Sequence, residues 1–110
     1  AAITQKVRKL SEKVVPNATK SPLSAKDWAA AYELIDTIYP SISGVVAIYD
    51  LTEKEKMVCY LTLFNLSANA EAVLMNQPLG SINKYRQTLR KKLQINDRNI
   101  DLYDFLSKMM

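Results

Sequence analysis

Signals for the start and the end of helices recur at short intervals between positions 50 and 93. Thr52 and Glu55 form a capping box, in which each side chain can accept a hydrogen bond from the backbone N–H of the other residue. Ser67 can cap a second helix, and the turn-forming segment 76–78 separates that helix from a third. The three helices fill about three dozen residues, which is the size of a helix-turn-helix.

The composition favours helices throughout the chain. Of its 110 residues 48% are hydrophobic, which is enough for one small domain with a compact core. Only two residues are glycine and four are proline, and long stretches are rich in Ala, Leu, Lys and Glu. We therefore expect an all-α fold, a helical bundle that contains a helix-turn-helix of three to four helices.

The chain divides into an N-terminal amphipathic helical arm with a linker (1–22), a helical lead-in (23–50) and a helix-turn-helix domain (51–110). Four apolar residues of the arm follow one another at intervals of four, three and four positions: Ile3, Val7, Leu10 and Val14. This spacing fits either a helix packed on its own domain or the tail of a longer dimerising helix. The chain begins with Ala-Ala rather than Met, which fits either a processed N-terminus or a fragment of a longer protein, and we expect the fragment.

The lead-in contains two predicted helices. Ser24 and Asp27 resemble a capping box, and apolar residues at helical spacing continue to Ile38 before a Tyr-Pro pair ends the helix. Ser41 can cap a short helix that extends to Tyr49 and is apolar on nearly all sides, so we expect it to be buried. Its glycine and its β-branched valines leave a strand as the alternative.

The helix predicted at about 79–93 has two unlike faces. At 100° per residue, one face gathers four core residues: Ile82, Tyr85, Leu89 and Leu93. The opposite face is polar and basic: Asn83, Lys84, Gln87, Thr88 and Lys91, with Arg90 on a flank. Six of the fifteen basic residues of the chain lie between positions 84 and 98, against one acid. The alternative is a solvated basic helix on an ordinary bundle.

Side chains of these types can read base edges in the major groove or bind phosphates. We therefore predict that this helix recognises double-stranded DNA. Four side chains would face the groove: Asn83, Lys84, Gln87 and Lys91. Arg90 and Lys92 would contact phosphates, and Ser81 would offer its hydroxyl or backbone N–H to the DNA backbone.

Arg86 lies about 40° from Ile82 on the helix, beside the core rather than on the outward face. An unpaired guanidinium at such a position is costly, so it needs a carboxylate from an earlier helix. We predict an ion pair between Arg86 and Glu55 that fixes the recognition helix.

Several of these residues occur in a familiar order: Leu51-Thr52-x-x-Glu55, Leu66-Ser67, Ala72, Ser81-Ile82 through Arg86, and Leu89-Arg90-Lys91-Lys92-Leu93. Over about 24–106 the chain resembles the LuxR/GerE-type helix-turn-helix, in the version common in Bacteroidetes regulators. The resemblance implies a four-helix domain that binds DNA as a homodimer. It also implies a place at the C-terminus of a longer transcriptional regulator, behind a sensor, receiver or repeat region that would end in the arm.

Four positions depart from that family pattern. Asn69 and Glu71 replace a Lys and an Ile, Pro78 replaces the Ser that caps the third helix, and Thr88 replaces an Arg. The Ile position is normally buried, so Glu71 requires a rotated helix or a basic partner. These changes favour a second hypothesis, in which a degenerate helix-turn-helix serves as a dimerisation or protein-interaction module.

A last short helix carries Tyr103, Phe105 and Leu106, which are either dimer contacts or residues that close the core. The chain has no His, no glycine-rich phosphate loop and no paired acids, so we expect no catalytic or metal site, no cofactor and no enzyme activity. It also has no apolar run of about 18 residues. The single cysteine, Cys59, suits a core position and a reducing compartment, which favours a cytoplasmic protein.

Overall fold

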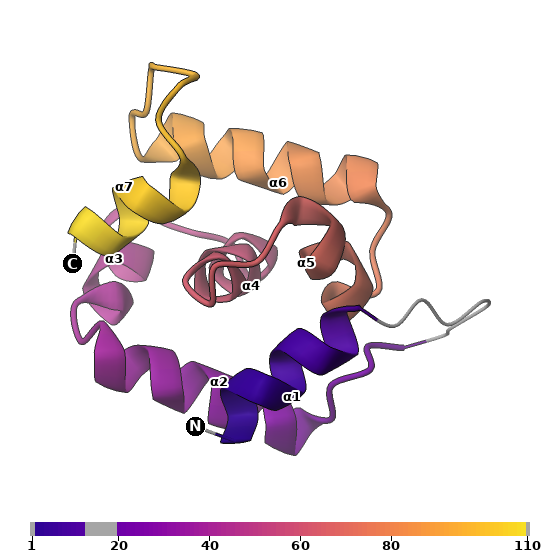
Figure 1. Ribbon diagram of the computed structural model, residues 1–110. Coiled ribbons are helices and arrows are strands. Elements are labelled where there is room, and N and C mark those ends of the chain that lie inside the picture. Colours follow the sequence, from indigo (N-terminus) through magenta and orange to yellow (C-terminus); the bar gives the residue numbers. More distant parts are fainter. Residues whose placement is uncertain (1, 13–19, 110) are drawn as a thin grey trace.

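The computed structural model describes residues 2–12 and 20–109, and the secondary structure of this part of the chain consists of α-helices joined by turns and loops (Figure 1). The predicted all-α class is confirmed. The seven helices are α1 (Ala2–Ser11), α2 (Ala25–Ile38), α3 (Ile42–Ile48), α4 (Glu53–Thr62), α5 (Ala68–Met75), α6 (Leu79–Lys92) and α7 (Leu102–Met109). None of these helices combines the length and the apolar character that crossing a membrane requires.

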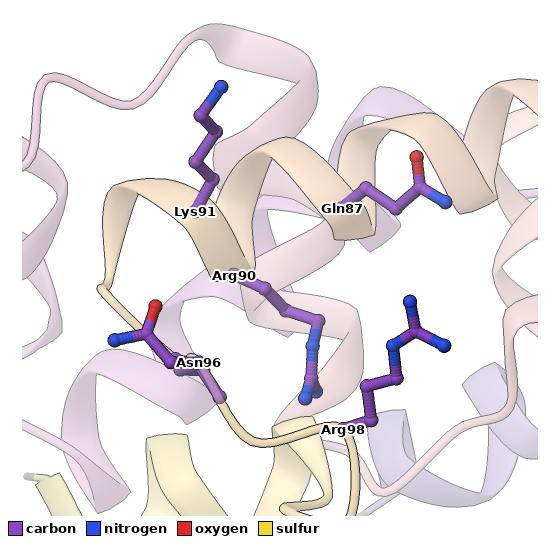
Figure 2. A pocket seen from close by; sticks show the side chains of 6 residues that line it. Gln87, Arg90, Lys91, Asn96 and Arg98 are labelled. Carbon is purple, nitrogen blue, oxygen red and sulfur yellow. The ribbon is translucent and has the colours of Figure 1, made fainter.

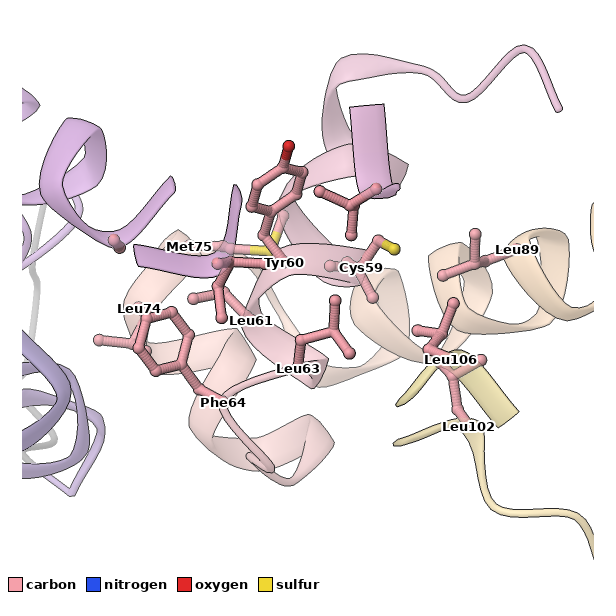
Figure 3. Packing of buried hydrophobic residues seen from close by; sticks show 14 of the residues in the cluster. Cys59, Tyr60, Leu61, Leu63, Phe64, Leu74, Met75, Leu89, Leu102 and Leu106 are labelled. Carbon is pink, nitrogen blue, oxygen red and sulfur yellow. The ribbon is translucent and has the colours of Figure 1, made fainter. Parts of the chain in front are cut away.

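Helix α4 lies at the centre, and the other helices surround it (Figure 1). It contacts α2, α5, α6 and α7, and five consecutive residues from Val58 to Thr62 are buried, so nearly every side of its second half faces protein. Figure 3 shows Phe64 and Leu74 on one side of this core, with the leucines of α6 and α7 on the other. Helix α6 runs along one edge of the molecule, and α2 runs along the opposite edge (Figure 1).

The predicted helix starts are confirmed where a side chain can cap the first turn. The Ser24 hydroxyl accepts the Asp27 amide at 3.1 Å, and the Asp27 carboxylate accepts the Ser24 amide at 3.3 Å. The Thr52–Glu55 box closes in the same way, with distances of 3.2 and 2.9 Å. Ser67 caps α5 through the Ala70 amide. Each bond satisfies a backbone N–H that the helix itself leaves without a partner.

Helices α5 and α6 are each followed by a left-handed residue that is not glycine. Asn76 has φ 51° after α5, and Gln94 has φ 60° after α6. Beyond α6, the Ile95 amide donates back to the Arg90 carbonyl at 2.9 Å, which is the long hydrogen bond of a Schellman motif. The chain thus leaves both helices by tight, fully bonded turns.

The prediction for the segment 41–49 is confirmed in one respect and wrong in two. The segment is a helix, α3, rather than a strand, but the Ser41 side chain makes no capping hydrogen bond. Ile42 and Val45 are buried, whereas Ile48 is 78% exposed, so the helix is not buried on nearly all sides. A helix of two turns presents only one face to the core, and its apolar composition does not change that geometry.

The N-terminal helix packs on its own domain, as the first of the two alternatives expected. Val7 is fully buried, and α1 contacts α2 and α5. Lys6 also pairs with Asp27 at 3.0 Å, and an Arg8 nitrogen donates to the Phe64 carbonyl. Position 14 of the predicted apolar row, and positions 16–19 of the predicted linker, lie outside the described residues.

Candidate nucleic-acid interface

Helices α5 and α6 are joined by the three-residue turn 76–78, and α6 packs on both α4 and α5. The buried face of α6 is the predicted one, because Ile82 and Leu89 are fully buried and Leu93 nearly so. Tyr85 completes this face and is half-buried. The core thus fixes which side of α6 faces outward.

The outward side of α6 carries four exposed polar side chains, here called the α6 row: Asn83, Lys84, Gln87 and Lys91. Among the residues that the structure describes, none accepts a hydrogen bond or forms an ion pair with these four side chains. Helix α6 contains no acid, so nothing on the same helix neutralises the two lysines. The row can therefore offer amide and ammonium donors to an anionic ligand.

Two cations that were predicted to bind phosphates are used inside the molecule. Arg90 donates from its two terminal nitrogens to the carbonyls of Asp97 and Ile100, both at 2.9 Å. Lys92 donates to Glu55 Oε1 at 2.6 Å and to a backbone carbonyl at 2.8 Å. Because both residues lie at the flanks of α6, where the following loop and the start of α4 approach, we reassign them from phosphate contact to positioning.

Ser81 lies in the first turn of α6 and is half-buried. Its backbone N–H donates to the Pro78 carbonyl at 3.0 Å, and the Pro78 cap position makes no side-chain capping bond. Of the two groups predicted to contact DNA at Ser81, the hydroxyl is therefore the one that this turn leaves available.

The predicted pair between Arg86 and Glu55 is wrong, although Arg86 does bind a carboxylate from an earlier helix. Its Nε lies 2.7 Å from Oε1 of Glu71, and one of its terminal nitrogens donates to the Leu66 carbonyl at 3.0 Å. Glu55 instead binds Lys92, which is six residues, or about 9 Å, farther along α6. The start of α4 lies beside the end of α6, so it is out of reach of a side chain at the middle of that helix.

Glu71 is one of the four positions that depart from the family pattern, and its environment explains how a carboxylate is accommodated there. Its side chain has no solvent exposure, one oxygen accepts Arg86, and the other accepts the Thr62 hydroxyl at 2.7 Å. Burial raises its pKa, and the Arg86 guanidinium and the Thr62 hydroxyl offset part of that effect. The expected basic partner is present, and one carboxylate joins α4, α5 and α6.

A concavity of about 720 Å³ lies at the C-terminal end of α6, between the helix and the loop that follows it. Figure 2 shows Arg98 extending from this loop toward the level of Gln87, and Lys91 extending outward from the helix. Six residues line the concavity, and none of them is acidic: Gln87, Arg90, Lys91, Ile95, Asn96 and Arg98.

Asn96 and Arg98 were absent from the predicted interface. The sequence signal was available, because the basic cluster extends to position 98. The predicted helix ends at about position 93, however, and helical periodicity cannot place a side chain on the irregular loop beyond it.

Helix α7 closes the core of the chain. Leu102 and Leu106 are buried, and Figure 3 shows them beside Leu89 of α6. Leu106 has no exposed surface, so its proposed role as a dimer contact is wrong and the alternative role in the core holds. Tyr103 and Phe105 are half-buried and retain some surface for a partner.

The described residues offer few groups for nucleophilic catalysis or metal binding. Cys59 is buried, which raises the pKa of its thiol to about 12 and keeps it protonated. Within residues 2–12 and 20–109, no three His, Cys, Asp or Glu side chains are grouped to hold a metal ion.

Comparisons with protein-family models, with curated proteins and with solved structures give no match to this chain. The geometry of α4, α5 and α6 is therefore the basis on which a function is assigned.

Proposed function

We propose that this chain binds duplex DNA as a helix-turn-helix domain, with α6 in the major groove. The observation that carries the proposal is the α6 row, four exposed and unpaired donor side chains on the uncovered side of a helix without acids. An α-helix fits the major groove of B-DNA, and the 14 residues of α6 give it a length of about 21 Å.

The support behind α6 suits such a role. Ile82 and Leu89 anchor one face in the core, and the pair between Arg86 and the buried Glu71 ties the helix to α5. Lys92 fixes its far end to the start of α4. A recognition helix held in this way loses little conformational freedom on binding, and this favours affinity for a rigid duplex.

The wider assignment rests on the resemblance to LuxR/GerE-type domains. The order of α4, α5, α6 and α7 agrees with the four helices that the resemblance implies. We extend the proposal accordingly to a cytoplasmic transcriptional regulator that acts as a homodimer, with a sensor or receiver region upstream in the same protein. Tyr103 and Phe105 are the α7 residues left for a dimer contact.

The test is binding of the chain to a pool of random duplex DNA at two salt concentrations, followed by sequencing of the retained DNA. We expect an enriched, roughly palindromic motif and binding that weakens steeply with salt, because phosphate contacts release counterions. Weak binding without enrichment would contradict the proposal.

A matched control is the double variant Asn83→Ala/Gln87→Ala, which removes two exposed amides and no charge. We expect it to keep salt-sensitive binding and to lose the enriched motif, because amide side chains read bases whereas lysines mainly bind phosphate. Enrichment of an unchanged motif by this variant would place sequence readout elsewhere on the molecule.

A second candidate function is that of a protein-interaction or dimerisation module. It is favoured by two exposed isoleucines, Ile38 at the end of α2 with 55% exposure and Ile48 at the end of α3 with 78% exposure. Sedimentation without DNA separates the two functions. A stable dimer that Ile48→Glu converts to monomer, together with DNA binding that hardly depends on salt, would favour the module.

A further inference from the structure

The loop after α6 carries an arginine, Arg98, whose side chain has no bonding partner among the described residues. Arg98 is exposed, and its guanidinium neither pairs with an acid nor donates to a carbonyl anywhere in residues 2–12 or 20–109. The nearest acid in sequence, Asp97, accepts the Asn99 amide with its carboxylate at 2.9 Å. Arg98 therefore retains its full donor capacity.

The backbone that presents Arg98 is held in place on both sides. Arg90 donates to the carbonyls of Asp97 and Ile100, which flank Arg98 in the chain. The Ile100 amide donates to the Asp97 carbonyl at 3.2 Å, and Ile95 is buried at the start of the loop. Because α6 itself clamps the loop, ordering Arg98 for a ligand costs less than it would on a free loop.

The concavity is continuous with the α6 row, because Gln87 and Lys91 belong to both. Arg98 extends from the loop toward the level of Gln87, whereas the Lys91 side chain extends from the helix away from Arg98 (Figure 2). A guanidinium and the amides of Gln87 and Asn96 are donors that suit the oxygens of a phosphate group.

We propose that this concavity binds a phosphate of the DNA backbone, with Arg98 as its cation and the amides of Gln87 and Asn96 as further donors. The inference rests on the proposed DNA binding and deepens it. The loop 94–101 acts as a second contact element that binds one strand beside the groove occupied by α6. It supplies phosphate contacts in place of those predicted for Arg90 and Lys92, whose side chains are hydrogen-bonded within the molecule. A phosphodiester is favoured over a free phosphate because the concavity opens onto the α6 row.

The experiment measures the dissociation constant for a duplex oligonucleotide by fluorescence anisotropy across a series of salt concentrations. It compares the wild-type chain with Arg98→Ala, Arg98→Lys and the control Lys26→Ala. Lys26 is an exposed lysine on α2, at the opposite edge of the molecule, so the control removes the same unit of charge far from α6. Circular dichroism and thermal unfolding confirm that each variant is folded.

We expect Arg98→Ala to weaken binding about tenfold at roughly 50 mM salt and to lower the salt slope by about one unit, and Arg98→Lys to keep part of the affinity. Lys26→Ala should stay close to wild type. If wild type binds the duplex and Arg98→Ala matches Lys26→Ala, the inference is overturned and the proposed function stands. If wild type does not bind duplex DNA at any salt concentration, both are overturned.

Inorganic phosphate serves as the second probe, in an NMR titration that follows the amide signals of 95–98. We expect the duplex to shift these signals at concentrations where inorganic phosphate leaves them unchanged. Equal shifts with phosphate alone, combined with unaltered duplex affinity of Arg98→Ala, would assign the concavity to a small anion and overturn the inference.

Discussion

The guanidinium Nε of Arg86 lies 2.7 Å from Oε1 of Glu71, a carboxylate that has no solvent exposure. The second oxygen of Glu71 accepts the hydroxyl of Thr62, and Arg86 also donates to the carbonyl of Leu66. Glu71 thereby connects α4, α5 and α6, and Arg86 extends the network to the turn between α4 and α5. We infer that this network fixes the orientation of α6 relative to α4 and α5.

Removal of one partner of this pair should be far more damaging than removal of both. Arg86→Met leaves Glu71 buried without its cation, and we expect the free energy of unfolding to fall by about 3 kcal/mol or more. The double variant Arg86→Met/Glu71→Leu should recover much of that loss, since no uncompensated charge remains. Urea denaturation of the single and double variants measures the coupling, and additive effects would contradict the assignment.

The pair of Glu55 and Lys92 should make the free energy of unfolding depend on pH in the acidic range. Burial pushes the pKa of Glu55 upward, but hydrogen bonds from Lys92 and from the Thr52 amide bring it below the ordinary value of 4.5. Its contribution is therefore complete above about pH 4.5 and is lost as the pH falls through the lower folded-state pKa.

The matching variant is Glu55→Gln, which keeps the shape of the side chain and removes the charge. At neutral pH we expect it to be less stable than wild type by about 1–2 kcal/mol. The difference should shrink as both proteins are denatured at successively lower pH. A difference that stays constant down to pH 2 or thereabouts would show that the charge of Glu55 does not contribute.

Two neighbouring positions on the α6 row should differ in what they control. Lys91→Ala should weaken binding to all DNA sequences and lower the salt slope by about one unit, because a lysine contact to phosphate carries no sequence information. Gln87→Ala should change which sequences are preferred, because an amide can bond a base edge. Anisotropy titrations with a selected and a scrambled duplex separate the two effects, and identical profiles would mean that the wrong side of α6 faces the groove.

Substitution of Leu106 should lower the stability of the fold and leave the oligomeric state unchanged. It has no exposed surface, so Leu106→Ala is expected to lower the free energy of unfolding by about 2–5 kcal/mol by leaving a cavity. The oligomeric state at concentrations where the variant is folded should match that of wild type in sedimentation. Unchanged stability with a weakened dimer would restore the dimer-contact role to this residue.

Features that depend on a few neighbouring residues could be predicted from the sequence. The capping boxes at Ser24 and Thr52 form as predicted, because donor and acceptor lie three residues apart on the same turn. The two faces of α6 are also as predicted, since a fixed rotation per residue determines which side chains share a face. The core side of that helix in turn fixes the position of its exposed row.

Features that depend on how helices are placed against each other could not be predicted in this way. Periodicity showed that Arg86 would lie beside the core, but the choice between Glu55 and Glu71 depends on the offset between α4 and α6 along their axes. The exposure of Ile48 has the same origin, because composition does not tell which side of a short helix meets its neighbours.

The sequence by itself determined the helical class, the helix starts and the side of α6 that carries the donors, because each follows from contacts within one or two helical turns. Only the tertiary structure decided which cations remain free. Arg90 and Lys92 lie where the following loop and the start of α4 approach α6, so they are bound internally, whereas Arg98 projects from the loop that Arg90 holds. The number of basic residues in a sequence therefore does not give the number of cations available to a ligand, because packing binds some of them within the molecule.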